Sequence, residues 1–99
     1  MVTGIRFEWD PRKDLENRSS HGVPFAEAET AFLDDFAVLI DDPDHAELEE
    51  RFLLLGVSAR LRLLTVIHCV REHGDVIRII SARRATRREK EQYERRWTR

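Results

Sequence analysis

Short runs rich in apolar residues recur along this chain, and residues typical of turns separate them. The first run, Ile5–Trp9, alternates apolar and polar residues, which is the pattern of a β-strand buried on one side. The runs predict five strands, at residues 5–9, 36–40, 51–57, 62–70 and 76–82. The connections 58–60 and 71–75 are short enough for hairpins, so we expect an antiparallel sheet.

Helical signals follow the first predicted strand. Asp10 and Pro11 are typical of an N-cap and a first helical position, and they predict a helix from Pro11 to about Ser20 that ends at Gly22. Pro24 then begins a second predicted helix. Apolar residues fall on one side of this second helix, at positions 25, 28, 31 and 32.

The helical pattern returns after the last predicted strand. From Arg84 onward, Ala85, Tyr93 and Trp97 share one face of a predicted helix. An acidic turn is expected at Asp41–His45. The order of elements is therefore one strand, two helices, four strands and one helix. We predict an α+β fold, with two N-terminal helices and one C-terminal helix packed on an antiparallel sheet of four to five strands.

Size and composition are those of one globular domain, which we place at residues 1–99. Apolar residues make up 41% of the sequence and charged residues 36%, and no apolar run approaches the roughly 20 residues that span a bilayer. The first residues lack the pattern of a secretory signal, so we expect a cytoplasmic protein without membrane contact. The single cysteine, Cys69, lies in an apolar run and is expected to be a buried hydrophobic residue.

Charge is divided unevenly along the chain. From Arg78 to the end there are nine Lys and Arg against three Glu, whereas the preceding part has eight against sixteen acidic residues. The net charge of −2 therefore conceals a strongly basic end. Such asymmetry indicates a polyanionic partner, an acidic protein partner, or both.

Familiar catalytic motifs are absent. The sequence contains no Cys-x-x-Cys, His-Glu-x-x-His, glycine-rich phosphate loop or Gly-x-Ser-x-Gly, so nothing in it predicts a metal centre, a bound nucleotide cofactor or an esterase. With only four glycines, a phosphate would have to be held by side chains. Arginine suits that task, because its planar fork presents two donors to one phosphate.

Two residues in the predicted strands could carry chemistry. Arg78 lies between apolar residues, so it must pair with a carboxylate such as that of Glu50, or it must line an anion site. His68, on the preceding strand, is either a satisfied core residue or a proton-transfer group. Adjacent antiparallel strands would bring His68 and Arg78 near each other, which favours the second interpretation of both.

The basic segment after the last strand also has two interpretations. Pairs spaced by four residues in the predicted helix indicate an ordinary solvated surface. Four arginines nevertheless gather where the helix dipole disfavours cations, and we expect them to surround one anion. They are Arg83, Arg84, Arg87 and Arg88. Glu89 lies in the apolar stripe, and we expect it to pair with an arginine beneath the helix.

Several short motifs along most of the chain resemble those of one family, the BrnT toxins of type II toxin–antitoxin systems. The most specific is the segment Arg-Ile-Ile-Ser-Ala-Arg at 78–83 together with Trp9-Asp10. The others are Phe7-Glu8, Lys13, Asn17, His21-Gly22-Val23 with Phe25 and Ala28, Asp42-Pro43-Asp44-His45, Glu50-Arg51-Phe52, Ala85, Glu89 and Tyr93.

The resemblance implies a small ribonuclease with a RelE-like α+β fold that inhibits translation by cutting RNA. It also implies a DNA-binding BrnA-type antitoxin, which neutralises the toxin and represses the operon with the toxin as corepressor. One departure from the family pattern is Ser20, because the family commonly has a lysine just before the His-Gly pair. This chain therefore lacks the family's basic side chain at that position.

Together these observations predict metal-independent RNA cleavage, in which a 2′-hydroxyl attacks its neighbouring phosphate without a cofactor. This chemistry needs a base, an acid and positive charge. We expect Arg78 and Arg83 to stabilise the phosphate, and His68 to act as acid or base, with Glu50 as the alternative base. The residues expected to hold RNA are Arg51, Arg84, Arg87 and Lys13.

Two other functions are compatible with the same features. A non-catalytic binding module would use the basic end to dock an acidic partner or to assist DNA binding by a complex. A degenerate toxin that acts only as a transcriptional corepressor is allowed by Ser20. Cleavage of RNA by the purified protein separates the enzyme from both alternatives.

Overall fold

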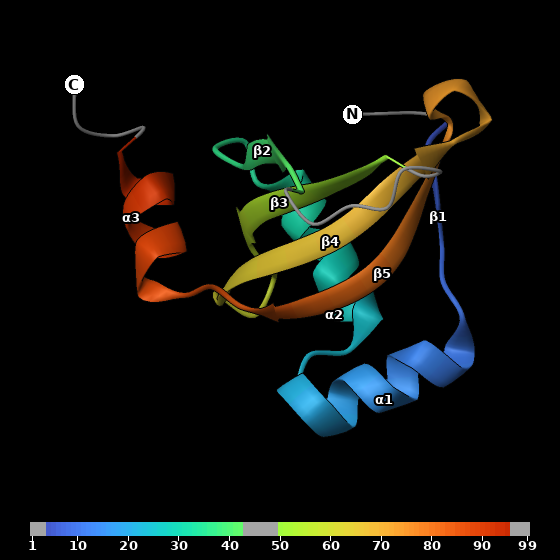
Figure 1. The fold of residues 1–99 in the computed structure, drawn as a ribbon, viewed down its shortest axis with the longest axis horizontal. Coiled ribbons are helices and arrows are strands. Elements are labelled where there is room, and N and C mark those ends of the chain that lie inside the picture. Colours follow the sequence, from blue (N-terminus) through green and yellow to red (C-terminus); the bar gives the residue numbers. More distant parts are fainter. Residues whose placement is uncertain (1–3, 43–49, 96–99) are drawn as a thin grey trace.

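A computed structural model describes residues 4–42 and 50–95 of the chain. It contains five strands and three α-helices in the predicted order (Figure 1). The strands are β1 (Arg6–Glu8), β2 (Val38–Asp41), β3 (Arg51–Val57), β4 (Leu63–Arg71) and β5 (Val76–Arg84). The helices are α1 (Pro11–His21), α2 (Phe25–Thr30) and α3 (Arg87–Glu94). Residues 43–49, which include positions 43–45 of the predicted acidic turn, and Trp97 lie outside the described residues.

Local capping explains where the helices begin and end. The Asp10 carboxylate accepts the backbone N–H of Arg12, and Gly22 adopts the left-handed conformation (φ 69°) that ends α1. At α3, Thr86 and Glu89 form a reciprocal capping box. Because β5 continues to Arg84, α3 begins at Arg87 rather than at the predicted position.

The strands form one sheet in the order β1-β5-β4-β3-β2. The predicted hairpins are confirmed, since β2, β3, β4 and β5 pair antiparallel in succession. The prediction of a purely antiparallel sheet was wrong, because β1 pairs parallel to β5. No hairpin ties β1 to its neighbour. The chain leaves β1 through α1 and α2 and enters β2 at the opposite edge, so this crossover sets the direction of β1.

One face of the sheet packs on α2, as Figure 1 shows. Phe25 and Ala28 of α2 are fully buried in one hydrophobic cluster that also contains Leu64 and Val66 of β4. Burial of a Phe, Leu or Val side chain contributes about 1.5–3 kcal/mol. The backbone approaches closely at Gly56, where an added Cβ would lie 2.6 Å from the carbonyl oxygen of Ala31. A glycine is therefore needed at that position.

Helix α3 lies beyond the end of the sheet rather than over its centre (Figure 1). This differs from the prediction that all helices pack on the sheet. Polar contacts hold α3 to the rest of the fold; among them, the Glu89 carboxylate accepts the hydroxyl of Thr65, and the Tyr93 hydroxyl donates to Asp34 at 2.6 Å. None of the described helices is long and apolar enough to cross a membrane.

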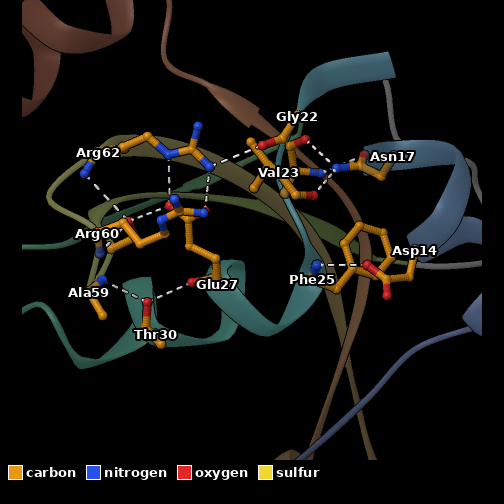
Figure 2. Close-up of polar contacts among 12 residues, drawn as sticks. Asp14, Asn17, Gly22, Val23, Phe25, Glu27, Thr30, Ala59, Arg60 and Arg62 are labelled. Atoms are coloured by element: carbon orange, nitrogen blue, oxygen red, sulfur yellow. Dashed lines mark hydrogen bonds and ion pairs between the residues drawn. The ribbon is translucent and has the colours of Figure 1, made fainter. Parts of the chain in front are cut away.

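A buried ion pair fastens α2 to the start of β4. Glu27 of α2 is only 7% exposed, and it accepts hydrogen bonds from the Arg62 guanidinium and, at 2.7 Å, from Ser58 (Figure 2). The hydrogen bonds from Arg62 hold the pKa of Glu27 below its ordinary value. Removing Arg62 would leave the buried Glu27 charge uncompensated, so this pair positions α2 on the sheet.

Candidate active site

Four basic side chains converge on a small hollow of about 130 Å³ beside the N-terminal part of α1. They come from four elements of the fold: Lys13 from α1, Arg51 from β3, Arg71 from β4 and Arg78 from β5. Asp10 and two isoleucines of β5 complete the lining. We call this hollow the cation pocket. Its excess of positive charge suits a phosphate group.

Strand register explains why these arginines meet. Arg51 pairs with Cys69 across β3 and β4, and Cys69 pairs with Arg78 across β4 and β5. Residues opposite each other in register point to the same face of a sheet, so Arg51 and Arg78 lie on one face with the buried Cys69 between them. The sequence-predicted residues Arg51, Arg78 and Lys13 are thus brought together.

Arg51 brings to the cation pocket a buried polar atom without a partner in the described part of the chain. Its Nε is buried and has no hydrogen-bond partner among the described residues. Buried polar atoms are nearly always hydrogen-bonded in native proteins, and an exception points to strain, function or a missing ligand. An anion placed in the cation pocket would supply an acceptor for this guanidinium.

Arg78 is held by a neighbouring strand. Its Nη1 donates to Oε2 of Glu8 on β1 at 3.0 Å, and the two residues are register partners. Of the two alternatives for Arg78, pairing with an acid was the less favoured; the structure shows such a pair, although the acid is Glu8 and not Glu50. Both side chains are about a third or more exposed, at 34% and 43%. An ion pair this exposed contributes little energy, so Arg78 can exchange Glu8 for a phosphate.

His68 does not lie in the cation pocket. It is 2% exposed, and its ring contacts Phe32 (centroids 4.9 Å apart) and Phe52 (5.9 Å) in the core. Burial lowers its pKa, which favours the neutral imidazole. Because Cys69 shares a face with Arg78, the adjacent His68 points to the opposite face. The predicted proximity of the His68 and Arg78 side chains was therefore wrong.

Arg83 also lies outside the cation pocket, in an ion pair with α3. Its Nη1 and Nη2 donate to the two carboxylate oxygens of Glu89 at 2.7 and 3.0 Å. The predicted pairing of Glu89 with an arginine is confirmed. Hydrogen bonds from Arg83 lower the pKa of Glu89 to about 2. In this conformation Arg83 joins the end of β5 to α3.

This ion pair predicts a dependence of stability on pH. Glu89 has an ordinary pKa of 4.5 when unpaired and about 2 when folded, so its stabilising contribution is complete above pH 4.5 and is lost as the pH falls toward 2. We expect the difference in Tm between the protein and its Glu89→Gln variant to shrink over that range. Glu91→Gln, at an exposed position of α3, provides the control. A Glu89→Gln difference that stays constant with pH would contradict this assignment.

The remaining predicted residues lie apart from one another. Arg83 and Arg84 are consecutive in β5 and point to opposite faces, so they do not surround one anion as expected. Arg84 lines a separate cleft of about 430 Å³ together with Tyr93. Arg87 is exposed in the first turn of α3, and Glu50 is exposed immediately before β3.

Sequence reasoning missed two members of the cation pocket. Asp10 was interpreted only as an N-cap, which it is, but it also lines the hollow. Arg71 was assigned to a connection, whereas β4 extends through it. Strand alternation carries the missing signal, because Arg71 is two residues from Cys69 and therefore shares its face. Among the described residues, no three His, Cys, Asp or Glu side chains gather as a metal site would require.

Comparison with known proteins places this architecture in a family. Residues 9–89 match the family described as "Ribonuclease toxin, BrnT, of type II toxin-antitoxin system". The fold is similar to that in the crystal structure of the Brucella abortus ribonuclease toxin BrnT. The TM-score is 0.62 at 25% sequence identity, over 84% of this chain and 99% of that one. No curated protein sequence matches the chain.

The family match covers most of the sequence and includes every residue of the cation pocket. The structural likeness supports the BrnT fold, whereas the RelE-like assignment stays a prediction. Membership also implies an RNA target and an antitoxin partner. This chain belongs to the BrnT family of ribonuclease toxins of type II toxin–antitoxin systems.

Proposed function

We propose that this protein is an endoribonuclease that cleaves single-stranded RNA without a metal ion, by attack of a 2′-hydroxyl on the adjacent phosphate. The observation that carries the proposal is the cation pocket, where Lys13, Arg51 and Arg78 face one small hollow. These cations supply the positive charge that offsets the negative charge developing on the pentacoordinate phosphate in the transition state. In other enzymes a metal ion often supplies it.

Each cation has a distinct place in this mechanism. Arg51 donates to a non-bridging phosphate oxygen, which gives its buried Nε an acceptor. Arg78 leaves Glu8 and donates to the second non-bridging oxygen. Both can use two donors in a fixed plane, so the arginines orient the phosphate as well as neutralise it. Lys13 contributes charge without fixing geometry.

Proton transfer requires groups other than His68, because the core encloses its ring. Asp10 is the carboxylate that lines the cation pocket, so we assign it as the base that accepts the 2′-hydroxyl proton, and the departing 5′-oxygen takes a proton from solvent water. Glu50, exposed beside Arg51, is the alternative base. Arg83, Arg84 and Arg87 then contribute to RNA binding only outside the pocket.

The family match supports the wider biological proposal. Cleavage of RNA in the cytoplasm would inhibit translation and arrest growth, and a BrnA-like antitoxin would neutralise the toxin. Contact with operator DNA would be indirect, through the antitoxin complex. The basic end of the chain is compatible with these partners, because nucleic acids are polyanions.

Cleavage assays in a chelator test the proposed reaction. Purified protein is incubated with end-labelled single-stranded RNA in excess EDTA, and we expect cleavage that leaves 2′,3′-cyclic phosphate ends. A matched RNA with a 2′-deoxy sugar at the cut site should stay intact, because it lacks the nucleophile. Cleavage only after a divalent metal is added would contradict the mechanism. RNA left intact under all conditions would favour the binding module or corepressor.

A further inference from the structure

A second hollow adjoins the cation pocket along the edge of β5. It has a volume of about 180 Å³ and lies between α1 and β5. Glu16, Ser20 and His21 of α1 line it together with Ser81 of β5. Lys13 and Ile80 line both hollows, so the two are neighbours that share one wall. We call the second one the α1–β5 hollow.

The α1–β5 hollow lies beside a part of β5 that, among the described residues, has no neighbouring strand on that side. Strand β1 stops pairing with β5 at Arg78, so the edge of β5 beyond that residue faces α1 instead of another strand. Ile80 is the extra residue of a β-bulge, because Ser81 pairs with Ile67 while Ile79 pairs with His68. Bulges re-aim side chains and are over-represented next to active sites.

Two of the side chains that line the α1–β5 hollow, Glu16 and Ser81, can only accept hydrogen bonds, whereas Lys13, Ser20 and His21 can donate them. Asn17 has used both amide hydrogens on the carbonyls of Val23 and Ala82, and its oxygen accepts from the N–H of Ala82 and the hydroxyl of Ser81. The Ser81 hydroxyl therefore already donates its only hydrogen to Asn17, so it can only accept a hydrogen bond from a ligand. The Glu16 carboxylate has no hydrogen bond or ion pair among the described residues, and it too can only accept.

These features specify the chemistry of a ligand. The polar edge of the ligand must present N–H donors to Glu16 and Ser81. Its phosphate must reach the basic side chains of the adjoining cation pocket. A ribonucleotide has both parts, and single-stranded RNA is commonly recognised through the Watson–Crick edges of its bases. Guanine carries two adjacent N–H donors on that edge, at N1 and N2. This arrangement matches the two oxygens of one carboxylate, as in bidentate base recognition.

We propose that the α1–β5 hollow is a base-binding subsite that selects guanine in the nucleotide next to the phosphate held in the cation pocket. The proposal rests on the proposed ribonuclease function and adds the residue that sets its sequence preference. Glu16 accepts from N1 and N2 of guanine, and Ser81 accepts a further N–H of the base. Lys13, between the two hollows, lies where the connecting sugar–phosphate backbone passes.

Binding of mononucleotides tests the subsite without requiring cleavage. Guanosine, inosine and adenosine 3′-monophosphates are titrated into the full-length, isotope-labelled protein and followed by NMR. We expect guanosine monophosphate to shift the amides of Glu16 and Ser81 and to bind about tenfold tighter than the adenosine nucleotide. Inosine lacks the N2 amino group, so its affinity should fall between the two. Equal affinities for all three would overturn the proposal.

Two variants make the test specific to Glu16. Glu16→Gln should remove the preference for the guanosine nucleotide. Its NMR spectrum should remain that of a folded protein, because residue 16 is exposed. Glu91→Gln, on α3 and away from both hollows, should keep the preference. A preference unchanged in Glu16→Gln would overturn the assignment. Selective nucleotide binding without RNA cleavage would instead contradict the proposed function alone, so the two failures are distinguishable.

Discussion

Replacing Arg78 with alanine is expected to lower the rate of RNA cleavage about 100-fold or more. In the proposed mechanism this arginine donates to the phosphate as charge develops, and removing one such donor from an active site commonly costs a factor of this size. Its exposed ion pair with Glu8 contributes little to folding, so the variant should stay as stable as the parent protein to within about 1 kcal/mol. Single-turnover cleavage of labelled RNA measures the effect.

The same sheet offers a matched control. Arg6 of β1 makes a similar ion pair with Glu72, at 3.2 Å, but both partners are more than 60% exposed. Arg6→Ala therefore removes an arginine and an ion pair without touching the cation pocket, and cleavage should be unchanged. Arg78→Lys keeps the charge but loses the planar fork, so it should retain intermediate activity. If folded Arg78→Ala cut RNA as fast as the parent protein, the cation pocket would not be the active site.

Signals that act over a few residues predicted much of the fold. The hairpins on either side of β4 follow from short connections between apolar runs, and the cap at Asp10 sets the start of α1. The parallel pairing of β1 with β5 joins residues about 70 positions apart in the chain. No local pattern encodes that pairing, because it depends on how α1 and α2 pack across the sheet.

The candidate site was also predictable only in part, because local signals identify residues but not how distant strands align. Arg51, Arg78 and Lys13 were identified by residue type, but their meeting depends on register across three strands. For His68, period-two alternation correctly groups it with Leu64 and Val66 but does not show that this face meets the helices. Arg83 was expected at the phosphate because four arginines gather at the end of the last strand, and which arginine Glu89 pairs with depends on the position of α3.

Asn17 illustrates a residue whose role only the assembled structure explains, and its replacement carries the largest expected loss of stability. It is the sole asparagine of the sequence and is 7% exposed. Its carboxamide imitates a neighbouring strand: it donates to the carbonyl of Ala82 at 2.7 Å and accepts the N–H of the same residue at 3.1 Å. A third bond, to the carbonyl of Val23, fixes the chain between α1 and α2 (Figure 2).

We expect Asn17→Ala to lower the free energy of unfolding by about 3 kcal/mol. The substitution leaves two carbonyls and one N–H without partners in a buried place, and each such group costs about 1–3 kcal/mol. Alanine is the better helix former by about 0.5 kcal/mol, which offsets only a small part. Urea denaturation measures the change, with Ser19→Ala, at an exposed position of α1, as the control.

Asn17→Ala should also affect function, because Asn17 positions other residues of the two hollows and does not itself take part in the reaction. Asn17 holds α1 against the edge of β5, and α1 carries Lys13 of the cation pocket and Glu16 of the α1–β5 hollow. Asn17→Ala should therefore loosen both hollows together, so that phosphate binding and base preference weaken in parallel in the protein that remains folded. An Asn17→Ala protein as stable as Ser19→Ala would show that the carboxamide does not hold α1 to the sheet.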